Sequence, residues 1–180
     1  MSDQDLKNIV EALLMSYGAP LSLERMQSVF DPSDCPSKSV LLSLLEQLMA
    51  EYADRSIELK SLASGYCFQT RPEYSRWIHA LMVEKPIKYS QALLESLAII
   101  AHNQPITRAE IEQIRGVTLS SSILKTLLER EWIRVASYRD VPGKPAVYTT
   151  TKQFLDYFNL KSLDELPSLK NPQEVLLEQE

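Results

Sequence analysis

Gln104-Pro105-Ile106-Thr107-Arg108-Ala109-Glu110-Ile111 decides the fold, because a related stretch, Ala19-Pro20-Leu21-Ser22, stands about 85 residues earlier. In both stretches a helical pattern of apolar residues is followed by a proline, an apolar residue and a Ser or Thr. Ser22 is placed to cap the helix that follows it, and Thr107 is the matching position in the second stretch. This agreement at matched spacing predicts two copies of one small domain.

The residues around these stretches predict the same order of elements twice. In the first copy, apolar residues at steps of three and four predict helices that begin near residues 2, 22 and 37–39. Alternating segments then flank Ser64-Gly65, as in a β-hairpin. The second copy has a third helix at residues 119–130 and strands at residues 133–136 and 147–150. Three helices and a hairpin are typical of a winged helix.

The predicted fold class is therefore mainly α with small β-hairpin wings (α+β), in two tandem winged-helix domains. We expect the first domain at residues 1–82 and the second at residues 83–166. The junction is expected at Met82-Val83-Glu84-Lys85-Pro86, because proline disfavours helix in the residue before it. Residues 167–180 are expected to form a flexible acidic tail.

Composition excludes several classes of protein. The chain has 180 residues, of which 44% are hydrophobic and 24% charged, as in an ordinary globular protein. Its longest apolar run, Leu97-Ala98-Ile99-Ile100-Ala101, is far shorter than the roughly 20 residues of a membrane span. The acidic start, Ser2-Asp3-Gln4-Asp5, is unlike a signal peptide, so we expect a cytoplasmic protein. Cys35 and Cys67 are too few for a zinc site or a disulfide framework.

The sequence offers little for catalysis. The only histidines, His79 and His102, lie in predicted helices and belong to no catalytic motif. The four glycines are dispersed, whereas a phosphate-binding loop needs them clustered. We therefore predict no enzyme, no catalytic residue, no cofactor and no metal.

Charge argues against general binding to DNA, since the net charge is −5. Residues 1–82 carry seven basic and eleven acidic side chains, and residues 83–165 carry eleven and ten. The helix expected at residues 39–51 contains no Lys or Arg, and the one at 119–130 offers Lys125 and Arg130. That is a weak basis for reading bases in the major groove.

The most promising exposed loop is the wing of the second copy, residues 139–148, whose tip contains Pro142-Gly143-Lys144-Pro145. An ordinary hairpin loop is the equally open alternative.

Several motifs resemble those of the bacterial segregation and condensation protein B family. The first is Ala92-Leu93-Leu94-Glu95-Ser96-Leu97-Ala98-Ile99-Ile100-Ala101, followed by Gln104 to Ile111 and Ile114-Arg115-Gly116-Val117. Leu127-Leu128-Glu129-Arg130, the wing tip, Tyr148-Thr149-Thr150 and Leu163-Asp164-Glu165-Leu166-Pro167 follow in order. Glu131, Thr149 and Asn159 stand where that family commonly has glycine.

This resemblance implies a non-catalytic accessory subunit of the bacterial condensin-like complex, associated with the nucleoid through that complex. It implies a homodimer formed largely by the N-terminal domains. It also implies binding to the central segment of the kleisin subunit (segregation and condensation protein A), and through it to the structural-maintenance-of-chromosomes ATPase. Direct contact with DNA is expected to be weak or indirect.

The residues we expect at the kleisin surface lie on the second domain: Arg108, Glu110 and Arg115 on a helix, and Lys144, Pro145 and Tyr148 on the wing. The alternative hypothesis is a dimeric winged-helix DNA-binding regulator that uses Lys125, Arg130, Arg139 and Lys144. A scaffold for some other protein is a third.

Overall fold

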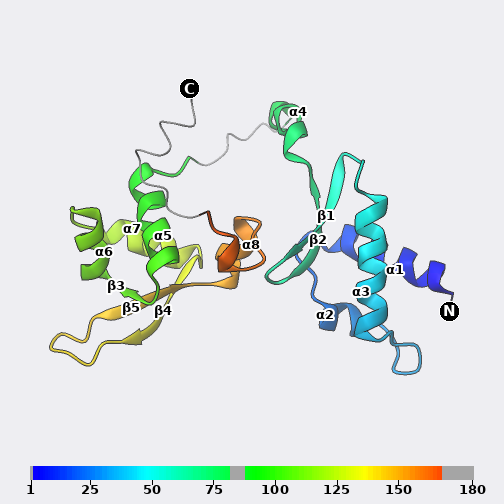
Figure 1. The fold of residues 1–180 in the computed structure, drawn as a ribbon, viewed down its shortest axis with the longest axis horizontal. Coiled ribbons are helices and arrows are strands. Elements are labelled where there is room, and N and C mark those ends of the chain that lie inside the picture. The colour runs from blue at the N-terminus through cyan, green and yellow to red at the C-terminus, as the bar shows by residue number, and fades with distance from the viewer. Residues whose placement is uncertain (1, 82–87, 168–180) are drawn as a thin grey trace.

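The computed structural model describes residues 2–81 and 88–167 (Figure 1). The expected junction at Met82 to Pro86 and all but the first residue of the expected tail, 167–180, lie outside these residues. The domain boundaries therefore stay a prediction.

The first unit is a winged helix, as the sequence predicts. Its elements are α1 (Asp3–Tyr17), α2 (Leu23–Gln27), α3 (Lys38–Glu51), β1 (Ile57–Leu62), β2 (Gly65–Thr70), η1 (Pro72–Tyr74) and α4 (Ser75–Leu81). The side chains of Ser2, Ser22 and Ser37 cap α1, α2 and α3. Strands β1 and β2 pair in antiparallel register, and Leu21 forms an isolated bridge with Tyr66.

The second unit repeats this order. Its elements are α5 (Gln91–Asn103), β3 (Ile106–Thr107), α6 (Arg108–Arg115), α7 (Ser121–Glu129), β4 (Ile133–Tyr138), β5 (Ala146–Thr150), α8 (Lys152–Tyr157) and η2 (Leu163–Glu165). Its three strands have the order β3-β5-β4, so β4 lies at an edge. The isolated bridge of the first unit corresponds to β3 of the second.

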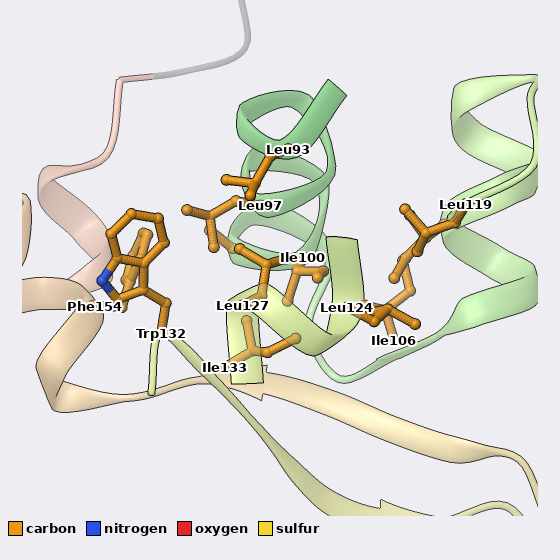
Figure 2. Close-up of a cluster of buried hydrophobic side chains, with 12 residues drawn as sticks. Leu93, Leu97, Ile100, Ile106, Leu119, Leu124, Leu127, Trp132, Ile133 and Phe154 are labelled. Atoms are coloured by element: carbon orange, nitrogen blue, oxygen red, sulfur yellow. The ribbon is translucent and has the colours of Figure 1, made fainter. Parts of the chain in front are cut away.

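Each unit has its own core. Leucines of α1 and α3 pack with Met26 and Tyr52 in the first. In the second, Trp132 and Phe154 lie beside the leucines of α5, and Ile106 and Leu119 lie at the opposite end (Figure 2). Each winged-helix unit therefore packs around side chains from its own segment of the chain.

Two details differ from the sequence-based expectations. Helix α3 begins at Lys38, so the expectation that this helix lacks Lys and Arg is wrong; Ser37, not a later serine, is its N-cap. Lys38 pairs with Glu24 of α2 at 2.5 Å. The helix predicted around His79 is present as α4. The sequence-based prediction did not include β3 and α8, which are short and depend on packing for stability.

None of the described helices has the combination of length and apolar character that a bilayer span requires.

Candidate functional site

Helix α6 and the wing carry the six residues predicted for a partner surface. Helix α6 begins with a capping box, in which the Thr107 hydroxyl accepts from the Glu110 N–H and the Glu110 carboxylate accepts from the Thr107 N–H. It ends at Gly116, which has a left-handed φ of 71°. The capping box and Gly116 define where α6 begins and where it ends.

Arg108 is held by three contacts inside the second unit. Its Nε donates to Glu112 Oε1 at 3.0 Å, its Nη1 donates to Ser121 Oγ at 3.2 Å, and its Nη2 donates to the Leu119 carbonyl. Arg108 therefore fixes the turn between α6 and α7. A guanidinium engaged in this way has fewer free donors for a partner.

Glu110 joins α6 to the base of the wing. Its Oε2 accepts from the Thr107 N–H at 2.7 Å, and its Oε1 accepts from Arg139 Nη2 at 3.2 Å. The Thr107 backbone bond, the Thr107 hydroxyl and the Arg139 charge lower the pKa of the Glu110 carboxyl. The carboxylate thus holds the wing against α6.

Arg115 lies on the other side of α6, with a side chain only 8% exposed. Its Nη2 pairs with Glu95 of α5 at 3.3 Å, while its Nε has no hydrogen-bond partner among the described residues. This contact fastens α6 to α5.

The three wing residues have different surroundings. Lys144 is exposed at the tip, with a φ of 37° and an N–H that donates to the Val141 carbonyl at 2.9 Å. The Pro145 carbonyl accepts from the Arg139 N–H at 3.0 Å. Tyr148 is half-buried against the core. The structure therefore connects Glu110 to the wing base, but it does not gather all six residues into one site.

A pair of hollows that sequence reasoning missed flanks strand β4. One, of about 510 Å³, is lined by Gln104, Arg134, Thr149, Thr150, Thr151, Lys152, Leu155 and Leu163. The other, of about 490 Å³, is lined by Leu128, Glu131, Ile133, Arg134, Val135, Thr151, Lys152 and Gln153. Arg134, Thr151 and Lys152 line both, so the hollows adjoin. We call this surface the β4 groove. No motif in the sequence indicates that residues of α8 line it beside β4.

An exposed apolar surface lies at the end of the first unit. Trp77 and Leu81 of α4 are 65% and 84% exposed, and the Tyr74 ring lies 6.4 Å from that of Trp77. In Figure 1, α4 stands apart from the core of its unit. Large apolar side chains exposed together on one short helix are typical of a contact surface.

The cations named for the DNA hypothesis are mostly engaged within the chain. Lys125 pairs with Glu129 at 3.7 Å, and Arg139 pairs with Glu110. Arg130 lies over the ring of Tyr89, at 4.7 Å from its centroid. These contacts reduce the positive charge that α7 and the wing base present to a phosphate backbone.

Within residues 2–81 and 88–167, no cluster of three or more His, Cys, Asp and Glu side chains is arranged to hold a metal ion.

Comparison with known proteins finds matches that span most of the chain. The family model described as "Segregation and condensation complex subunit ScpB" matches residues 8–169. A protein of Coxiella burnetii named "Segregation and condensation protein B homolog" is 52% identical over 171 residues, 95% of this chain and 82% of that protein. The "Segregation and condensation protein B" of Syntrophotalea carbinolica is 41% identical, covering 100% and 90%. The crystal structure of ScpB from Mycobacterium tuberculosis matches at 27% identity and a TM-score of 0.41, covering 89% and 98%.

Proposed function

The chain belongs to the segregation and condensation protein B family, and on this premise we propose that it binds the central segment of the kleisin subunit as a homodimer. The observation that carries the proposal is the family match over residues 8–169, which spans both winged-helix units. In this role the protein acts in chromosome segregation and condensation as an accessory subunit. It is associated with the nucleoid through the complex.

The subunit's proposed contribution is binding and not catalysis. The carboxylates and guanidinium groups of α6 serve in a helix cap and in ion pairs that hold α5, α6 and the wing together. The ATPase subunit of the complex supplies the energy, and this chain positions the kleisin relative to it.

Dimerisation is assigned to residues 1–82, and the apolar surface of α4 supports this assignment. Burying Trp77 and Leu81 against a second copy removes large apolar side chains from water, which favours association. An isologous contact between two α4 helices also follows the usual two-fold symmetry of homodimers.

Kleisin binding is assigned to residues 83–166. Lys144 and Pro145 lie at the wing tip and are available to a partner. The side chains of Arg108, Glu110, Arg115 and Tyr148 contact other residues of the second unit and so support this surface. The β4 groove adds a second accessible surface on the same unit. Residues beyond 166 have no assigned role.

The DNA-binding regulator is not favoured, because the relatives carry segregation and condensation names and the cations of α7 and the wing base are engaged within the chain.

The experiment is light scattering coupled to size-exclusion chromatography, on the full chain alone and mixed with the kleisin from the same organism. A free mass near twice 20.5 kDa that rises to include a kleisin chain supports the proposal. Trp77→Glu is expected to give a monomer, and Val141→Glu, at an exposed apolar position on the wing of the second unit, is expected to stay dimeric.

A monomeric wild type at micromolar concentrations contradicts the homodimer. An unchanged mass with a well-folded kleisin contradicts kleisin binding. Salt-sensitive binding to duplex DNA in its place supports the alternative function.

A further inference from the structure

Strand β4 has one open side from Arg134 onwards, whereas its first residue, Ile133, is buried. The strand order β3-β5-β4 leaves it paired only with β5, and Arg134 to Tyr138 are all exposed. Exposed edge strands carry unpaired backbone groups that can accept another strand.

The hydrogen-bond pattern between β4 and β5 determines which residues of β4 turn their backbone groups to the open side. The Thr151 N–H donates to the Trp132 carbonyl at 3.2 Å, so Trp132 directs its carbonyl towards β5. Successive residues of an antiparallel strand alternate between facing the partner and facing away. Arg134 therefore faces β5, and Ile133 and Val135 turn their N–H and carbonyl groups to the open side.

The side chains at this edge offer two different environments. Arg134 lies opposite Thr149, and Val135 lies opposite Tyr148, which packs against the core. On the core side, Val135 and Leu128 are 38% and 36% exposed and line one hollow. Arg134, Thr151 and Lys152 line both hollows, and Thr149 and Thr150 line only the other one.

The charge of the β4 groove is positive. Neither Arg134 nor Lys152 makes an ion pair with any described residue, and Glu131 is the one acid among the described lining residues. The hydroxyl of Thr149, which lines the same hollow as the two cations, is buried without a hydrogen-bond partner in the described chain. A complementary occupant brings negative charge and hydrogen-bonding groups.

We propose that the open edge of β4 binds an extended, acidic segment of the kleisin as an added antiparallel or parallel strand. The residue paired with Val135 is apolar and packs on Leu128. Its sequence neighbour is Asp or Glu and pairs with Arg134 and Lys152. Strand addition supplies affinity through the backbone, and the two hollows supply specificity through alternate side chains. This inference rests on the proposed function and names the kind of segment recognised.

Affinity measurements by isothermal titration calorimetry, with the intact kleisin as the probe, test the proposal. Val135→Pro removes the outward N–H and leaves the bonds to β5 in place, since proline is tolerated at edges. We expect it to weaken binding by about tenfold or more, while Val135→Ala, which keeps the N–H, costs only about threefold. Arg134→Glu is expected to weaken binding about tenfold. Lys125→Glu makes the same charge change outside the groove and is expected to stay within about twofold of wild type.

Hydrogen exchange on the unaltered protein gives a second readout that needs no variant. The amides of Val135 and Tyr138 are expected to exchange fast in the free dimer and slowly in the complex. Wild-type binding with unchanged exchange at β4, or with Val135→Pro and Arg134→Glu both at full affinity, overturns strand addition and leaves the proposed function standing. Absence of wild-type binding overturns the proposed function itself. Loss of duplex-DNA affinity in Arg134→Glu, with kleisin affinity unchanged, overturns the identity of the occupant.

Discussion

Glu131 ends the turn after α7 in a conformation suited to glycine, with a φ of 55°. Its N–H donates to the Leu128 carbonyl at 2.9 Å, which closes the helix end. The left-handed region costs a residue with a Cβ roughly 1–2 kcal/mol. We expect Glu131→Gly to raise the free energy of unfolding by about 1 kcal/mol, measured by urea denaturation.

The matched control is Glu129→Gly, two residues earlier and within α7. There the backbone is helical, so the same substitution is expected to lower the free energy of unfolding by about 1 kcal/mol. Equal effects at both positions would contradict the conformational explanation.

Gln104 connects α5 to β5, a role of its side chain that the sequence analysis does not predict. Its Oε1 accepts from the Thr150 N–H at 2.7 Å and from the Thr150 hydroxyl at 3.0 Å, and its Nε2 donates to the Ala101 carbonyl. Gln104→Ala removes the acceptor for a part-buried N–H, and we expect the free energy of unfolding to fall by about 2 kcal/mol. Gln153→Ala on the exposed side of α8 is expected to change it by less than about 0.5 kcal/mol in the same denaturation experiment.

At the scale of elements, the cap of α6 makes stability depend on pH. Hydrogen bonds from Thr107 lower the pKa of Glu110 below its ordinary value of 4.5. The folded chain thus binds this proton less readily than the unfolded chain. The stability contributed by Glu110 is present above about pH 4.5 and is lost as pH falls below that value.

We expect Glu110→Gln to lower the thermal midpoint at about pH 7, and we expect its difference from wild type to shrink as pH falls below about 4.5, in calorimetric scans across that window. Glu129→Gln removes an exposed ion pair at 3.7 Å and is expected to leave the wild-type pH profile nearly unchanged. A constant difference between Glu110→Gln and wild type at every pH would show that Glu110 acts through packing alone.

At the scale of the whole molecule, the two winged-helix units contact each other where the β1–β2 turn meets the end of α8. The Ala63 N–H donates to the Leu160 carbonyl at 3.2 Å, and the Ser64 N–H donates to Asp156 Oδ1 at 3.1 Å. Gln69 Nε2 donates to Asn159 Oδ1 at 2.7 Å. In Figure 1 the turn lies next to α8. These bonds set the orientation of one winged helix relative to the other.

Removing the side chains of this contact is expected to loosen the orientation. For the double variant Gln69→Ala with Asp156→Ala, we expect a larger radius of gyration by small-angle scattering and faster exchange of the Ser64 amide. Lys161→Ala is the control, because this exposed neighbour contributes no side-chain hydrogen bond to the described contact. Identical scattering for wild type and the double variant would mean that the two units are held together by other contacts.

The sequence by itself determined the two winged helices and their order. Apolar spacing, the Ser and Thr caps and the hairpin turns are local features, and local features are present in the sequence as a pattern. Thr107, for example, caps α6 as its correspondence to Ser22 predicts. The family resemblance was carried by the same ordered motifs and is confirmed by the match over residues 8–169.

Only the tertiary structure decided which polar side chains support the fold and which remain accessible. Arg108, Glu110 and Arg115 were predicted as partner residues on charge and position, yet each contacts residues of another element or turn. The β4 groove depends on β4 lying at the sheet edge and on α8 packing beside it. Edge position and long-range contacts arise from chain topology, and sequence spacing does not encode them because the partners lie far apart along the chain.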